Sequence, residues 1–91
     1  MTTKSEPSPF SCYDRAEPNE PIFTLLGRDP MAGILIRLWV KLREEAGEDR
    51  AKLEDALACA AACERWAISK GKLARVEAAV ESLKRMAMPD R

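Results

Sequence analysis

The sequence predicts a small, mainly α-helical domain that follows a polar N-terminal arm. Ninety-one residues make one domain at most. Two long segments space their apolar residues at the helical period and are bounded by typical helix start and stop residues. Residues 1–20 hold three of the six prolines among serine, threonine and charged residues. We therefore expect a flexible arm over residues 1–20 and a single helical domain over residues 21–91, built as a helical hairpin or as three helices.

The short segment that joins the arm to the first helix has an extended pattern. Pro21 is followed by a β-branched and aromatic run from Ile22 to Leu26, and Gly27 ends it. This pattern predicts either one short strand or a loop that lays Phe23 and Leu25 on the helices. A single strand has unpaired edges, so a strand here would suggest pairing with a second copy of the chain.

The first helix is predicted over residues 30–46. Asp29 is a favourable N-cap, Pro30 suits the first helical position, and Gly47 stands where a left-handed C-terminal cap belongs. Gly33 lowers helix stability by about 1 kcal/mol relative to alanine, so we expect another group to approach the backbone there. Trp39 is expected in the core. One apolar face at helical spacing is formed by Met31, Ile34, Leu35, Leu38, Trp39 and Leu42.

The second helix is predicted over residues 50–69, after Asp49, with an alanine-rich centre at 56–63 that lets another helix come close. Its residues Leu53, Leu57, Ala60 and Ala61 are expected to pack on the first helix. At Gly71 the helix either ends, with a third helix over 72–88, or continues. A heptad-like series supports continuation, because apolar or small residues occupy nearly all of positions 59, 62, 66, 69, 73, 76, 80, 83 and 87. A continuous helix would need a second subunit to cover its outer half, which predicts a homo-oligomer formed through the C-terminal helix.

The residue types argue against catalysis. The chain has no histidine, which removes the commonest general base and imidazole metal ligation. Its carboxylates occur as adjacent pairs, which point about 100° apart on a helix and do not form acid–base dyads. No glycine-rich phosphate loop is present. Cys59 and Cys63 are interpreted as small buried hydrophobes and the three cysteines as reduced thiols. We expect no catalytic, cofactor-binding or metal-ligating residues.

Charge and hydropathy predict a protein of the cytoplasm. The 15 basic and 15 acidic residues balance, so the chain has no overall preference for nucleic acid or acidic membranes, and direct nucleic-acid binding is not expected. The sequence shows no signal peptide and no apolar run near the roughly 20 residues that cross a membrane.

Eight residues are the candidates for contact with a partner. Arg28 and Asp29 precede the first turn of the first helix, where free backbone N–H groups favour an anion, although Arg28 can equally pair with a local carboxylate. Arg37 can add a second cation to that place. Trp66 is a candidate interface anchor. The apolar series on the C-terminal helix adds Leu73, Val76, Val80 and Leu83.

Several of these stretches resemble small proteins encoded in phages and prophages of proteobacteria. The resemblance covers about residues 20–67. It rests on the run from Glu20 to Ala32, on Ile36-Arg37-Leu38-Trp39, and on an alanine-rich helix that ends in Cys63-Glu64-Arg65-Trp66-Ala67. It implies a non-enzymatic accessory protein that acts in the host cytoplasm by stoichiometric binding to a host factor, most concretely as an anti-CRISPR-like inhibitor of bacterial defence. The alternatives are an oligomeric sponge that binds a cyclic-nucleotide immune signal, and a structural or assembly protein.

Overall fold

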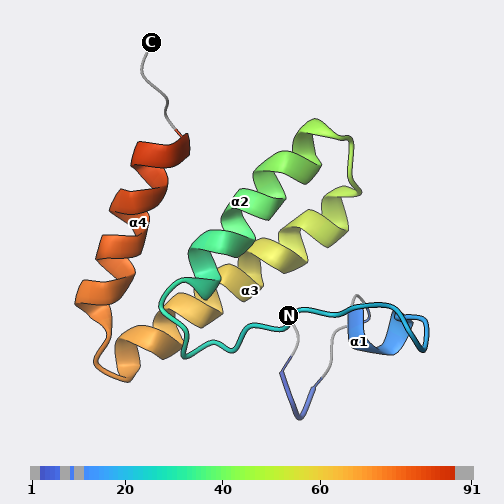
Figure 1. The fold of residues 1–91 in the computed structure, drawn as a ribbon, viewed down its shortest axis with the longest axis horizontal. Coiled ribbons are helices and arrows are strands. Elements are labelled where there is room, and N and C mark those ends of the chain that lie inside the picture. The colour runs from blue at the N-terminus through green and yellow to red at the C-terminus, as the bar shows by residue number, and fades with distance from the viewer. Residues whose placement is uncertain (1–2, 7–8, 10–11, 88–91) are drawn as a thin grey trace.

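The computed structural model describes residues 3–6, 9 and 12–87 of the chain. These residues form four helices: α1 (Cys12–Arg15), α2 (Ala32–Glu45), α3 (Arg50–Ser69) and α4 (Leu73–Ala87) (Figure 1). No strand occurs among them, so the prediction of a mainly helical protein is confirmed. Part of the expected arm and the expected last helical residue, Met88, lie outside the described residues.

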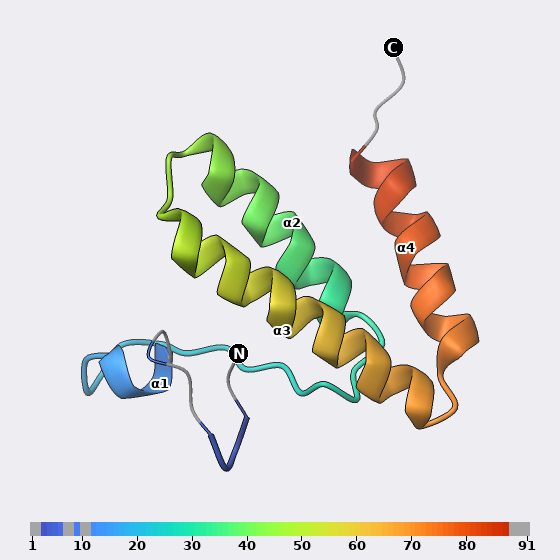
Figure 2. The ribbon, with the colours of Figure 1, turned by 180° about the vertical axis from the view of Figure 1, so that it is seen from behind.

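The segment that precedes α2 is a loop and not a strand. Residues 21–26 carry no regular secondary structure. Phe23, which was expected to pack on the helices, is 85% exposed, whereas Leu25 is half-buried. The loop runs along α3 toward the start of α2 (Figure 2), so it brings Gly27 and Arg28 to the C-terminal end of α3.

The two long helices α2 and α3 lie side by side and run in opposite directions (Figures 1 and 2). The turn between them is made by the residues that the sequence indicated. Gly47 takes a left-handed φ of 85°, and the N–H of Glu48 reaches back to the carbonyl of Arg43 at 2.9 Å. Asp49 then caps α3 by accepting from the backbone N–H of Lys52.

The start of α2 lies two residues later than predicted. Asp29 does act as a cap, because its carboxylate accepts from the N–H of Met31 at 2.9 Å and its carbonyl accepts from the N–H of Ala32 at 3.0 Å. These bonds close a tight turn that contains Pro30 and leads into the helix. The first regular helical residue is therefore Ala32 and not Pro30.

The chain breaks at Gly71, so the alternative of one continuous helix is wrong. Gly71 adopts a left-handed φ of 83°, its N–H donates to the carbonyl of Ile68, and the N–H of Lys72 donates to the carbonyl of Ala67. Paired bonds of this kind end a helix in the Schellman manner. The chain then turns back, and α4 contacts both α2 and α3, with Val76 and Ala79 buried.

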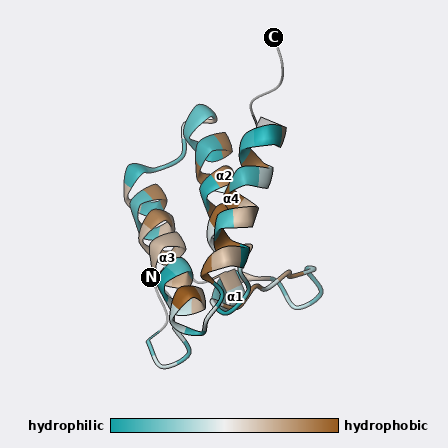
Figure 3. Cartoon of the chain, turned by 90° about the vertical axis from the view of Figure 1, so that its left-hand side faces the viewer, coloured by the Kyte–Doolittle hydropathy of each residue, from teal (hydrophilic) through white to brown (hydrophobic). Residues whose placement is uncertain are grey.

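The core between α2 and α3 is built mainly from small residues. Its most buried members are Ala32, Val40, Leu53, Ala60 and Ala67. Leu53 and Ala60 were expected there. The expectation that Trp39 lies in the core is wrong, because it is 37% exposed; on the same apolar face Met31 and Leu42 are 56% and 58% exposed, whereas Ile34 and Leu38 are half-buried. Figure 3, coloured by hydropathy, shows that hydrophobic and hydrophilic residues alternate along α2, α3 and α4.

Candidate functional site

A charged pair joins α2 to the C-terminal part of α3. Arg37 on α2 donates from Nε and Nη2 to the two carboxylate oxygens of Glu64 on α3, at 2.9 and 2.8 Å. The Glu64 side chain lies directly over buried Gly33, where a Cβ atom would be only 2.5 Å from its Cγ and 2.8 Å from its Oε2. The expectation that a group approaches the backbone at Gly33 is confirmed, and that group is Glu64.

This pair shifts both ionisations in the direction that favours the charged forms. The hydrogen bonds from Arg37 lower the pKa of Glu64, and the same contact raises the pKa of Arg37, against the opposing effect of partial burial. The Arg37 guanidinium is thus engaged across the α2–α3 interface. Arg37 was predicted to add a cation for a ligand near Arg28. Its position does not support this role, because the guanidinium already binds the Glu64 carboxylate in a bidentate geometry.

At the end of the molecule where α3 turns into α4, the loop before α2 closes against both helices. The backbone of Gly27 lies next to Cys63 and Trp66, with 3.7 Å from the Cβ position of Gly27 to the Trp66 Cβ. Lys72 Nζ donates to the carbonyl oxygen of Arg28 at 2.8 Å. We call this place the Arg28–Lys72 corner and define it by Leu26, Arg28, Trp66, Lys70, Lys72 and Leu73.

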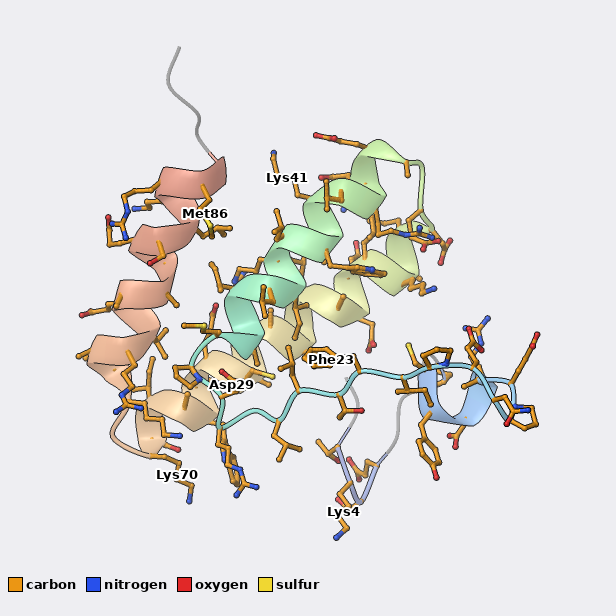
Figure 4. All side chains as sticks on the ribbon, in the orientation of Figure 1. Lys4, Phe23, Asp29, Lys41, Lys70 and Met86 are labelled. Atoms are coloured by element: carbon orange, nitrogen blue, oxygen red, sulfur yellow. The ribbon has the colours of Figure 1, made fainter. Side chains whose placement is uncertain are left out.

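The corner exposes apolar area beside positive charge. Leu26, Trp66 and Leu73 are each about half exposed, at 54%, 55% and 48%. Lys70 Nζ lies over the Trp66 ring, 4.9 Å from its centroid, and so holds a cation against an accessible aromatic face. Figure 4 shows the labelled Lys70 and Asp29 at this end of the molecule.

Few carboxylates offset these cations. From Arg65 to Val76 the sequence contains four basic residues and no acidic residue. The Asp29 carboxylate is used to cap the turn before α2, and among the residues that the structure describes Arg28 makes no ion pair. A shallow hollow beside these charges is lined by Thr24, Leu25, Leu26, Arg28, Asp29 and Lys72. The corner is therefore suited to an acidic or phosphorylated group with an apolar or aromatic neighbour.

The structure gathers some of the sequence-predicted residues and separates others. Arg28, Asp29, Trp66 and Leu73 meet at the corner. Val76 is buried inside the chain, and Val80 and Leu83 are half-buried along the same helix. Lys72 and Glu64 were not among the predicted site residues. The Gly33 and Arg37 pair, four residues apart on one helical face, was the sequence signal that could have pointed to a carboxylate between them.

Cys59 and Cys63 lie one turn apart on α3, and Cys63 contacts the loop before α2 at Gly27. Cys59 and Cys63 are free thiols and half-buried. Burial and the neighbouring Cys59 raise the pKa of Cys63 to about 11, so its thiol stays protonated at neutral pH. Within residues 3–6, 9 and 12–87, no group of three or more histidine, cysteine or acidic side chains is placed to hold a metal ion. None of the helices in this part of the chain has the length and apolarity of a membrane span.

Comparisons with protein families, curated proteins and solved structures find no match to this chain.

Proposed function

We propose that this protein is a non-enzymatic, phage-type accessory protein that binds a host protein stoichiometrically, most concretely as an inhibitor of bacterial defence. The Arg28–Lys72 corner is its contact surface. The observation that carries the proposal is the exposed Trp66 ring, flanked by Lys70 and by the loop that holds Arg28. Tryptophan and arginine are the residues most enriched among interface positions that dominate binding energy.

The charge of the corner indicates the chemistry of the partner. The corner holds Arg28, Lys70 and Lys72 against the single carboxylate of Asp29, which caps the turn before α2, so positive charge is in excess there. A partner surface with carboxylates at its rim would gain both steering and specificity from this arrangement. The proposed host protein thus presents an acidic rim around an apolar centre that accepts Trp66.

A defence assay tests the proposal with matched variants. The protein is expressed in bacteria that carry, or lack, a given defence system, and the plating efficiency of a sensitive phage is measured. The wild-type chain is expected to restore plating only in a defended strain, and a double substitution Trp66→Ala with Lys70→Glu is expected to abolish this effect. Trp66 is 55% exposed, so its truncation removes less packing than a core substitution would, and circular dichroism checks that each variant is folded. Lys84→Glu is the control, because it makes the same charge change at an exposed position far along α4.

The outcome is decisive in both directions. Restored plating that disappears in the corner variant and persists in the control supports the proposal, and co-purification then identifies the bound defence protein. If the folded wild-type chain restores plating in no strain of a broad defence panel, the inhibitor role is wrong. If the corner variant is as active as the wild type, the protein binds through another surface.

The same corner supports one alternative function, a sponge for a cyclic-nucleotide immune signal. An aromatic ring beside Arg28, Lys70 and Lys72 can stack a base while the cations neutralise phosphates. Thermal unfolding in the presence of cyclic di- and trinucleotides at about 1 mM distinguishes this alternative, because a ligand that binds only the native state raises the midpoint. A shift that is lost in the corner variant would favour the sponge over the host-protein inhibitor.

A further inference from the structure

The outer side of α2 carries an apolar strip that the chain itself covers only in part. Met31, Leu35, Trp39 and Leu42 are spaced by four, four and three residues, which places them on one side of the helix. Their exposed fractions are 56%, 44%, 37% and 58%. The opposite side of α2 is closed by α3 through Ala32, Gly33 and Val40. We call these four residues the outer α2 face.

The fourth helix contacts α2 but leaves these four residues partly exposed. The buried residues of α4 are Val76 and Ala79, near its first half, whereas Met86 near its end is 73% exposed. In Figure 4, Met86 extends from α4 toward α2. The apolar side of α4, which the sequence predicted to contact a second subunit, is thus partly covered by α2 and α3. The larger exposed apolar surface belongs to α2.

We infer that the outer α2 face binds the same face of a second copy of this chain, so that the protein is a two-fold symmetric homodimer. In an antiparallel pair of α2 helices, Met31 of one copy meets Leu42 of the other, while Leu35 and Trp39 meet near the two-fold axis. Such an isologous contact needs a face that is complementary to itself. An apolar strip with large residues at both ends and in the middle satisfies this condition.

Charge agrees with a second copy as the occupant. From Met31 to Leu42 the only charged residues are Arg37 and Lys41, and Arg37 is held by Glu64 on the other side of the helix. Depletion of charge is typical of the buried centre of an interface. The formal net charge of the chain is zero, so two copies meet no overall electrostatic repulsion.

The exposed area corresponds to a weak interface. With full side-chain areas of roughly 180–250 Å², the exposed fractions of the four residues together with Met86 amount to about 500 Å² per copy. Two copies then bury about 1000 Å², which is the lower bound of a specific interface. The expected dimer is accordingly of modest affinity and depends on protein concentration.

Molar mass in solution tests the inference on the full chain. Light scattering during size exclusion, at protein concentrations from about 10 to about 500 µM, is expected to give a mass that rises toward about 20 kDa, twice the chain mass of 10.2 kDa. Leu42→Glu is expected to hold the mass at 10.2 kDa over this whole range and to raise the dissociation constant at least tenfold. Ile68→Glu is the matched control, because Ile68 is 41% exposed on α3, outside this face.

Three results bear on the inference. A wild-type dimer that dissociates in Leu42→Glu, but not in the control, supports it. A wild-type chain that remains a monomer up to the highest concentration overturns it, as does a dimer that Leu42→Glu leaves intact. Leu42→Ala, which introduces no charge, repeats the test if circular dichroism shows that the glutamate variant is unfolded. The corner variant Trp66→Ala with Lys70→Glu keeps the dimer, so failure here is distinct from failure of the proposed function.

Discussion

The contact of Glu64 with Gly33 predicts that a normally stabilising substitution is destabilising here. Alanine is a better helix former than glycine by about 1 kcal/mol, so Gly33→Ala in the interior of α2 would ordinarily stabilise the fold. A Cβ at this position, however, would lie 2.5 to 2.9 Å from three atoms of the Glu64 side chain. The Glu64 side chain can turn aside, but in doing so it gives up the two hydrogen bonds from Arg37.

The magnitude follows from the two opposing effects. Because Glu64 is a flexible side chain, the clash is relieved at the cost of its contact with Arg37 and not by strain in the backbone. The Arg37–Glu64 pair is worth about 1–2 kcal/mol, a discounted value because the Arg37 side chain is 40% exposed. After the helix-propensity gain of about 1 kcal/mol is subtracted, Gly33→Ala should lower the free energy of unfolding by up to about 1 kcal/mol.

A double-mutant cycle with Glu64→Ala isolates the cause. Once Glu64 is shortened, the space over Gly33 is free, and Gly33→Ala should stabilise the chain by about 0.5–1 kcal/mol. The sign of the effect therefore reverses between the two backgrounds, with a coupling of up to about 2 kcal/mol. Urea unfolding, followed by circular dichroism at one fixed protein concentration, measures the free energy of unfolding of the four proteins in the cycle. Stabilisation by Gly33→Ala in the wild-type background would refute the close packing of Glu64 on α2.

Three further predictions concern ionisation, backbone conformation and thiol reactivity. The pKa of Glu64 is lowered in the folded state, so the charged Glu64 side chain stabilises the fold above its ordinary pKa. This stabilisation is lost as the pH falls through the lowered pKa. The free energy of unfolding should therefore fall more steeply between about pH 5 and pH 3 for the wild type than for Glu64→Gln. Gly71→Ala should cost about 1 kcal/mol in urea unfolding because its φ is left-handed, whereas Gly27→Ala, where a Cβ meets only ordinary contacts, should be nearly neutral. In timed alkylation at about pH 8 followed by mass spectrometry, exposed Cys12 should react well before Cys63, whose raised pKa leaves little thiolate, and equal rates would contradict its burial.

Local signals in the sequence were sufficient to place most of the helix ends. Gly47 and Asp49 bound the turn between α2 and α3 as predicted, because a left-handed glycine and a carboxylate cap act through bonds to residues within five positions. The break at Gly71 was left open for the opposite reason. The heptad-like series continues across it, and only the hydrogen bonds to Ala67 and Ile68 show that the chain turns.

The candidate site was predicted less completely because it depends on contacts between distant segments. Arg28 and Trp66 were chosen separately from the sequence, and the structure brings them to one corner. No sequence spacing indicates that Lys72 Nζ reaches the carbonyl of Arg28, 44 residues earlier. Arg37 was assigned to that corner by its charge, whereas its contact with Glu64 places it between the helices.

Two effects decide which side of α2 faces α3: the size of the side chains that are buried, and how closely the two helix backbones can approach. The side with larger residues offers more apolar area, but α3 presents alanines and the Glu64 carboxylate, which fit against small residues and Gly33 at short range. Ala60→Leu should therefore lower the free energy of unfolding by about 1–3 kcal/mol, because fully buried Ala60 has no room for a larger side chain. Leu35→Ala, at a position that is 44% exposed, should cost less than about 1 kcal/mol in the monomer while it weakens the dimer. Urea unfolding and light scattering on the same samples separate these effects, and an Ala60→Leu variant as stable as the wild type would show that the two helices do not pack at this distance.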